Sequence, residues 1–186
     1  MDEGVGQDIQ RIKGIKTDIK MNTEDLLKLW AKSKKGDSEI RYSLIYHLLD
    51  TVAVTKALWE YTFQQDLKDF ISGQLGIIND EAIVWLSYWV GLHDIGKASP
   101  AFQRKCTTAM NELKELDFIF INEDNNHGEV TSLLLKKFLA EKLGLQLANN
   151  IAITVGGHHG VFPRAEQINS IGLDTGKGAK WKESQR

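Results

Sequence analysis

Apolar residues recur along most of the chain at intervals of three and four, the spacing that places side chains on one face of an α-helix. The pattern is clearest over residues 43–61, 80–92, 127–143 and 145–159. Runs that alternate between apolar and polar residues over the length of a strand do not stand out. The sequence therefore predicts an all-α protein, folded as a helical bundle.

Polar residues and glycines indicate where these helices begin and end. Asn22 or Thr23 suits the N-cap of a short first helix, and Lys32–Asp37 is typical of a charged loop. Asp80 suits the start of a helix with a strongly apolar stripe, and Gly144 suits a helix end. The stripe after Asp80 comprises Ala82, Trp85, Leu86, Trp89 and Val90. Five apolar residues at this spacing predict a buried helix, with its tryptophans in the core.

The two ends of the chain lack this periodicity. Residues 1–21 are polar and contain three glycines, so we expect a flexible N-terminal extension, with Met21 as an alternative natural start. After Pro163 the apolar spacing fails, and residues 173–186 are rich in glycine and lysine. Residues 172–178 invite comparison with a P-loop, but the G-x-x-x-x-G-K spacing and a preceding strand are missing. We therefore reject a nucleotide-binding loop there.

Composition narrows the classes of protein without naming one. A chain of 186 residues with a formal net charge of −2 suits one globular domain and shows no general attraction for nucleic acid. Cys106 is the only cysteine, which excludes a disulfide or a cysteine zinc cluster within one chain. The sequence shows neither a membrane span nor a signal peptide. We expect no membrane partner and a cytoplasmic location.

Histidines supply the first sign of chemistry. Each lies at or near the end of an amphipathic run, and the five are His47, His93, His127, His158 and His159. Any one of them alone is readily explained as a hydrogen-bonded core residue. Five together favour metal binding, because imidazole is the commonest protein ligand for transition metals and ligation requires such clustering.

Asp94 follows His93 directly, at the end of the apolar run. Adjacent helical residues point about 100° apart, so both side chains can touch one cation, or the carboxylate can bridge two. Gly96 permits a sharp turn or a close backbone approach, and Lys97 lies four residues after His93. An acid, an imidazole and an ammonium at a tight turn indicate a metal-assisted phosphate site.

Other residues near these motifs leave their roles open. Asp50 is three residues after His47, where it would either orient the imidazole or lie on the surface. Residues 102–105 would either hold a nucleic-acid strand or form one solvated helix face, which we favour. Gly156 and Gly157 each cost a helix about 1 kcal/mol relative to alanine, which predicts backbone packed tightly against another element.

The order of these motifs resembles the HD nuclease domain of the CRISPR-associated nuclease-helicase of type I systems. A histidine is followed by His-Asp-x-Gly-Lys at residues 93–97, His-Gly-Glu at 127–129 and Gly-Gly-His-His-Gly at 156–160. Leu-Trp-Ala-Lys-Ser at 29–33, with residues 46–50 and 57–59, resembles the same family. The similarity runs from about Leu29 to Pro163, and the paired histidines after two glycines are its most specific part.

The resemblance implies two metals in one cleft of a helical bundle of the HD-domain type, and it assigns the ligands. His47, His93 and Asp94 would hold the first metal; Asp94, as the bridge, would hold the second together with His127, His158 and His159. Mixed imidazole and carboxylate ligation suits manganese, iron, cobalt or nickel, with magnesium as a further option. Asp94 and Lys97 would be the catalytic residues, Lys97 by neutralising charge on the phosphate.

One departure from the family pattern concerns a further aspartate on the first metal, well downstream of the histidine pair. The sole aspartate after His159 is Asp174, which lies too close. We expect residues 22–186 to form an HD nuclease domain truncated at its C-terminal end, with a first metal site that is short of one carboxylate.

The function implied by the resemblance is metal-dependent cleavage of single-stranded DNA in CRISPR interference. Its partners would be the helicase portion of the same longer protein or a separate helicase subunit, and the CRISPR RNA-guided surveillance complex. Two alternatives remain open. One is an HD-type phosphohydrolase of nucleotides or cyclic nucleotides, and the other is a non-catalytic remnant that binds a partner.

Overall fold

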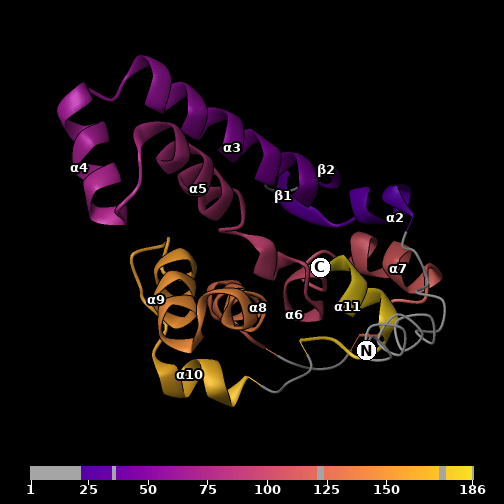
Figure 1. Ribbon diagram of the computed structural model, residues 1–186. Coiled ribbons are helices and arrows are strands. Elements are labelled where there is room, and N and C mark those ends of the chain that lie inside the picture. The colour runs from indigo at the N-terminus through magenta and orange to yellow at the C-terminus, as the bar shows by residue number, and fades with distance from the viewer. Residues whose placement is uncertain (1–21, 35–36, 121–123, 172–174, 186) are drawn as a thin grey trace, which may run out of the picture.

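Helices account for most of the chain, as the apolar spacing predicts (Figure 1). The structure is a computed structural model that describes residues 22–34, 37–120, 124–171 and 175–185. The predicted N-terminal extension, residues 1–21, and Asp174 lie outside these residues. In chain order the elements are α2 (Thr23–Leu27), β1 (Trp30–Lys34), β2 (Asp37–Ser43), α3 (Leu44–Tyr61), α4 (Gln65–Leu75), α5 (Asn79–Gly91), η1 (Ile95–Lys97, a 3-10 turn), α6 (Pro100–Gln103), α7 (Thr107–Glu115), α8 (His127–Leu143), α9 (Leu145–Gly156), α10 (Ala165–Ser170) and α11 (Ala179–Ser184).

Several predicted boundaries are confirmed. α3 begins at Leu44, and α8 begins at His127, with Asn126 as its N-cap accepting a hydrogen bond from the Gly128 amide at 2.8 Å. Gly144 ends α8 with φ of +78°, a conformation that favours glycine. Both ends of α8 agree with local capping chemistry, which can be read from the sequence.

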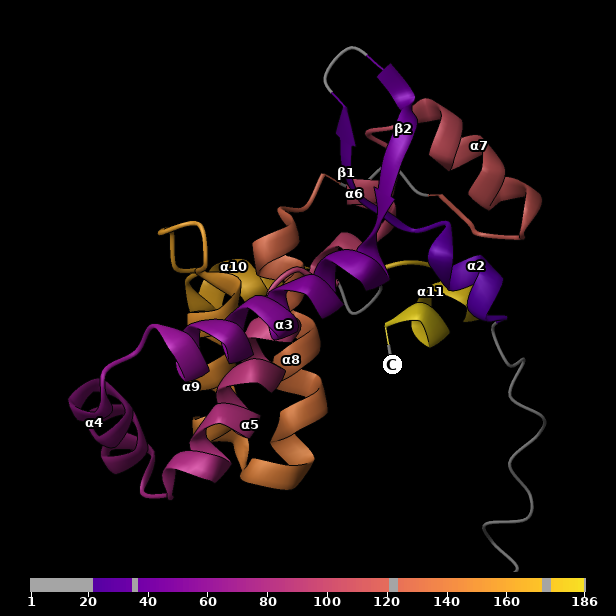
Figure 2. The same ribbon diagram turned by 90° about the horizontal axis from the view of Figure 1, so that it is seen from above.

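The hairpin formed by β1 and β2 contradicts the expectation that the chain has no strands and that residues 32–37 form a loop. The strands pair antiparallel, with Trp30 opposite Ser43, and stand beside α7 (Figure 2). A buried side chain fixes β1: the Gln103 amide donates to the Trp30 carbonyl at 2.8 Å and accepts from the Trp30 amide at 3.1 Å. This contact joins residues 73 positions apart, so the local sequence of β1 does not predict the strand.

Two helix pairs form the body around the centre of the molecule. α3 packs along α5, and α8 packs along α9, while α5 and α9 contact each other far less (Figure 1). η1 lies against α8, where the Gly96 amide donates to Thr131 Oγ1 at 2.9 Å. A Cβ on Gly96 would lie 2.0 Å from the His127 carbonyl oxygen, so this approach requires glycine. Among the described residues, no helix has the length and apolar character of a membrane span.

The apolar stripe of α5 is less buried than predicted. Ala82 is fully buried, but Trp85 is 41% exposed. Trp85 and Trp89 line an apolar pocket with Leu147 and Val155 of α9. The prediction of a buried helix was wrong. One side of α5 packs against α3, but the side that faces α9 borders this pocket.

The segment after Pro163, where the apolar spacing fails, still packs into the fold through two short helices, α10 and α11. Trp181 on α11 is 0% exposed and belongs to the main apolar cluster, together with Leu29, Leu44, Leu113 and Phe118. Its indole nitrogen donates to the Ile119 carbonyl at 2.8 Å. A helix of six residues carries too few apolar positions to show a period, so a single tryptophan makes the connection to the core.

Replacing Trp181 with alanine should lower the free energy of unfolding by about 3–5 kcal/mol, because a fully buried aromatic side chain leaves a cavity. Urea denaturation followed by circular dichroism measures this loss. Lys182→Ala, at the exposed neighbouring position, should change the free energy by less than about 0.5 kcal/mol. Equal unfolding of the two variants would contradict the placement of α11 in the core.

Candidate metal centre

Asp94 lies at the centre of the site, just after α5, and is 3% exposed. Its Oδ2 atom is 2.8 Å from His47 Nε2, 3.2 Å from His93 Nε2 and 2.7 Å from Lys97 Nζ. The Lys97 ammonium also donates to the Ala31 carbonyl at 3.3 Å. α3, the end of α5 and η1 thus bring three groups to one oxygen of Asp94.

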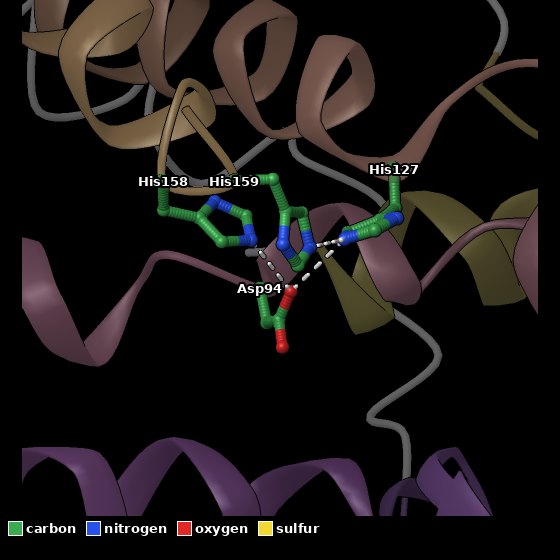
Figure 3. A group of neighbouring side chains, drawn as sticks. All are labelled: Asp94, His127, His158 and His159. Atoms are coloured by element: carbon green, nitrogen blue, oxygen red, sulfur yellow. Dashed lines mark hydrogen bonds and ion pairs between the residues drawn. The ribbon is translucent and has the colours of Figure 1, made fainter. Parts of the chain in front are cut away.

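The other carboxylate oxygen faces a second set of histidines. Oδ1 of Asp94 is 3.3 Å from both His127 Nε2 and His158 Nε2. His159 Nε2 lies 3.0 Å from His127 Nε2. Figure 3 shows these three imidazoles converging on one side of Asp94, while the second oxygen points away from them. The Nε2 atoms of His127 and His159 can share one proton or one cation, but they cannot both carry a proton in the space between them.

All six residues that the sequence singled out as ligands are therefore brought together. They form two groups that share Asp94, and within each group the ligand atoms lie within 4.8 Å of one another. One group contains His47 and His93, and the other contains His127, His158 and His159. The two oxygens of a single carboxylate thus face two separate sets of donors.

Backbone carbonyls fix the protonation of two of these rings. His93 Nδ1 lies 2.8 Å from the Val90 carbonyl, and His158 Nδ1 lies 3.0 Å from the Val155 carbonyl. Because a carbonyl only accepts, Nδ1 must carry the proton, and in the neutral ring Nε2 then presents its lone pair to Asp94. A lone pair facing a carboxylate is stabilised only when a proton or a cation lies between them.

Two buried atoms that lack a hydrogen-bond partner also call for a proton or a cation between them. Asp94 Oδ1 and His158 Nε2 are both buried without a hydrogen-bond partner, although they are 3.3 Å apart. Both atoms offer a lone pair, and the two lone pairs face each other across 3.3 Å, as metal ligands do around an ion. Imidazole with carboxylate suits the first-row transition metals. The residues present fit a metal centre.

The electrostatics of Asp94 agree with this arrangement. Burial by itself raises the pKa of the Asp94 carboxyl, but contacts with His127, His158, His93 and Lys97 outweigh burial and hold that pKa well below its ordinary value. The carboxyl is thus held in its anionic form, the form that acts as a metal ligand.

The histidine rings differ according to their surroundings. Burial lowers the pKa of His47, against the opposing pull of Asp94. Burial, together with repulsion from His158 and His127, lowers the pKa of His159. Contact with Asp94 raises the pKa of His158, and burial opposes this rise. His47 and His159 are therefore kept neutral, which is the form that binds metal.

Glycines bring the second set of histidines together. A Cβ on Gly156 would lie 2.4 Å from the Gly128 carbonyl oxygen and 2.0 Å from Ser132 Oγ. The start of α8, with His127, and the end of α9, before His158, therefore touch backbone to backbone. The prediction that Gly156 lies in tight backbone packing is confirmed.

Two alternatives left open by the sequence are decided by the geometry. The exposed Asp50 carboxylate accepts a hydrogen bond from the Tyr42 hydroxyl, which makes it a surface residue rather than a partner of His47. The solvated-face interpretation of residues 102–105 was wrong for Phe102 and Gln103, which are both buried. Phe102 packs against Trp30, and Gln103 holds β1, so neither is available to a nucleic-acid strand.

Thr131 is a positioning residue that the sequence did not reveal. Its hydroxyl accepts from the Gly96 amide at 2.9 Å and donates to the His93 carbonyl at 3.1 Å. It thereby holds the turn that carries Asp94 against α8. A threonine inside an amphipathic helix gives no signal of this role, because its partners lie 35 and 38 residues away.

A helical domain whose His-Asp pair is surrounded by further histidines belongs to the HD class of metal-binding domains. Residues 30–186 match the family described as Cas3, HD domain. The chain belongs to this family, as its motifs suggested.

Similar proteins agree with this assignment. The chain is 33% identical over 168 residues to the CRISPR-associated endonuclease/helicase Cas3 of Thermus thermophilus, covering 88% of this chain and 18% of that protein. A crystal structure of a CRISPR-associated protein superposes with a TM-score of 0.76 at 31% identity, over 86% of this chain and 18% of the other. The crystal structure of the Thermus thermophilus cas3 HD domain in the presence of Ni2+ gives a TM-score of 0.61 at 32% identity, over 86% of this chain and 60% of that chain. The chain thus spans about a fifth of the length of the full-length relatives.

Replacing Gly156 with alanine should push α8 and α9 apart and weaken metal binding at the histidines on both, because the new methyl group would overlap the Gly128 carbonyl oxygen. Isothermal titration with Mn2+ or Ni2+ measures the affinity, and urea denaturation measures stability.

Gly73→Ala is the matched control, since nothing lies within 4 Å of a Cβ at this position inside α4. It should leave metal affinity unchanged and stabilise the fold by about 1 kcal/mol through helix propensity. Unchanged metal affinity in Gly156→Ala would show that the close contact of the two glycines does not set the ligand geometry.

Proposed function

We propose that this chain is a metal-dependent nuclease domain that cleaves single-stranded DNA in CRISPR interference. The observation that carries the proposal is the sharing of one buried carboxylate, Asp94, by two groups of imidazole donors. Such paired sites suit phosphodiester hydrolysis, because two metals on one carboxylate lie close enough to contact the same phosphate. Membership of the family of CRISPR-associated HD nucleases supports the choice of DNA as substrate.

Each metal has a defined set of ligands in this proposal. His47, His93 and Asp94 hold the first, and Asp94, His127, His158 and His159 hold the second. The metals would be manganese, iron, cobalt or nickel, with magnesium as a poorer match to five imidazoles. When bound, the metal pair supplies an activated water and a clamp for the phosphate. The crystal structure of a related HD domain was determined in the presence of Ni2+, which supports the choice of metals.

Lys97 supplies positive charge beside these ligands. Its ammonium lies 2.7 Å from Asp94 Oδ2 and is held on the other side by the Ala31 carbonyl. In this position it fixes the rotamer of Asp94 and adds a fixed positive charge next to the place where the phosphate would lie. We propose that this charge stabilises the negative charge that grows on the phosphate during hydrolysis.

The two alternative functions remain distinguishable from this one. An HD phosphohydrolase would prefer free nucleotides or cyclic nucleotides, and the same substrate comparison that shows DNA cleavage reveals such a preference. A non-catalytic remnant would be expected to lose ligands, whereas all six are retained in a convergent arrangement. The retention of this set favours an active enzyme.

The partners are proposed from the family. Since the relatives are endonuclease/helicase proteins of which this chain spans about 18%, we propose that residues 22–186 act with a helicase portion, in the same longer protein or in a separate subunit. That helicase would feed single-stranded DNA to the metal centre. The CRISPR RNA-guided surveillance complex is the proposed source of the opened DNA.

Asp94→Asn should abolish cleavage of a single-stranded oligonucleotide in the presence of Mn2+, because it removes the negative charge shared by both ligand groups. The rate should fall at least about 1000-fold, and the metal content should fall with it. Gel analysis of a labelled strand and metal analysis of the purified chain provide the two measurements.

Asp80→Asn, an exposed change at the start of α5, the helix that precedes Asp94, is the matched control and should retain activity and metal. Cleavage by Asp94→Asn at the rate of the unsubstituted chain would contradict the proposal. Faster hydrolysis of free or cyclic nucleotides than of DNA would favour the alternative phosphohydrolase.

The two metals should bind with different affinities, because one group offers three donor residues and the other offers four. His159→Ala should weaken the tighter binding step and His47→Ala the weaker one. Each loss should exceed the roughly 10- to 100-fold effect of removing an outer hydrogen-bond partner. Titration of the metal-free chain with Ni2+ separates the two steps. Loss of both steps in either variant would show that the two groups do not bind metal independently.

A further inference from the structure

The chain leaves the second ligand group through a turn that exposes two large apolar side chains. After His159, Gly160 adopts φ of +82°, and its amide donates to the Gly157 carbonyl at 2.8 Å. Val161 and Phe162 follow, and they are 78% and 60% exposed. Single exposed apolar residues are common on protein surfaces. The position and support of Phe162 set it apart from such residues.

Phe162 is exposed but firmly supported. A Cβ on Gly157 would lie 2.3 to 3.0 Å from three atoms of the Phe162 ring, so the ring rests directly on the Gly157 backbone. The turn at Gly160 returns the chain to this contact. A ring that is already fixed loses little conformational entropy when a ligand stacks on it. Gly157 therefore supports the Phe162 ring from one side and leaves its other side open to a ligand.

The Phe162 ring rests on the residue that directly precedes two proposed ligands of the second group. Gly157 immediately precedes His158 and His159, two ligands of the second group. Phe102, an aromatic residue whose ring centre is 5.6 Å from that of His127, is only 8% exposed and packs on Trp30. Phe162, in contrast, is 60% exposed, so a ligand can reach its ring.

We propose that Phe162 stacks on a base of single-stranded DNA and so positions the neighbouring phosphate at the second ligand group. The inference rests on the proposed function for its substrate, and it adds a positioning residue that acts through the base. Stacking on an aromatic ring is tolerant of sequence, because every base has a flat face. The site would therefore bind a single strand without selecting a sequence.

The test uses equilibrium binding of a ten-nucleotide thymidine strand that carries one 2-aminopurine, whose fluorescence falls when it stacks. Phe162→Leu should weaken binding by about 5- to 100-fold, as is typical for the loss of one base–aromatic stack. It should also abolish the fluorescence change. Phe162→Trp should restore both. Val161→Ala, at the more exposed neighbouring position, is the matched control and should bind like the unsubstituted chain.

A second strand separates stacking from a general structural effect. When every nucleotide of the strand is abasic, so that no base can shift onto the ring, Phe162→Leu and the unsubstituted chain should bind equally. Equal weakening on both strands, or no weakening on either, would overturn the inference. Ni2+ titration of Phe162→Leu should match the unsubstituted chain and so verify an intact site.

Failure of this inference differs from failure of the proposed function. Ring-dependent binding without cleavage by the metal-loaded chain would retain Phe162 as a DNA-stacking residue and refute the nuclease. Cleavage with unchanged strand affinity in Phe162→Leu would retain the nuclease and refute the stacking role.

Discussion

The burial of the Asp94 carboxylate is the constraint on which the site and its surroundings depend. A buried anion without partners would be strongly destabilising, so the fold must bring cationic or donor groups to it from several elements. Lys97 satisfies part of this requirement at 2.7 Å. In their neutral form, His93 and His158 do not satisfy the rest, because their Nδ1 protons are donated to the carbonyls of Val90 and Val155. The remaining Nε2 lone pairs create a demand for positive charge at the points where metals would bind.

Backbone proximity is the means by which the fold meets this constraint. Gly96 brings the turn with Asp94 against the His127 carbonyl, and Gly128 with Gly156 brings the ends of α8 and α9 into contact. Each helical glycine costs about 1 kcal/mol in helix propensity. At Gly96, Gly128 and Gly156 a Cβ would overlap atoms of the facing backbone, so glycine permits the close approach.

The sequence predicted the longer helices and the residues of the centre well, because helical spacing and the chemistry of histidine are local signals. His127 at the start of α8 and Gly144 at its end are examples. The failures share one cause, which is dependence on distant contacts. β1 is held by the Gln103 amide, 73 residues away, and Trp181 reaches the core from a helix of only six residues. The exposure of Trp85 likewise depends on the distance between α5 and α9, which periodicity does not encode.

The separation of the two helix pairs gives the centre a structural role as well. His47 and His93 come from the α3–α5 pair, whereas His127, His158 and His159 come from α8 and α9, and α5 contacts α9 only sparsely. Asp94 lies between the two sets, so cations held on both of its oxygens would connect the pairs through one carboxylate. A ligand that binds only the folded chain stabilises it by mass action. In the proposed function, metal binding would therefore be linked to the assembly of the two halves, and the proposed ligands would also help to hold the domain together.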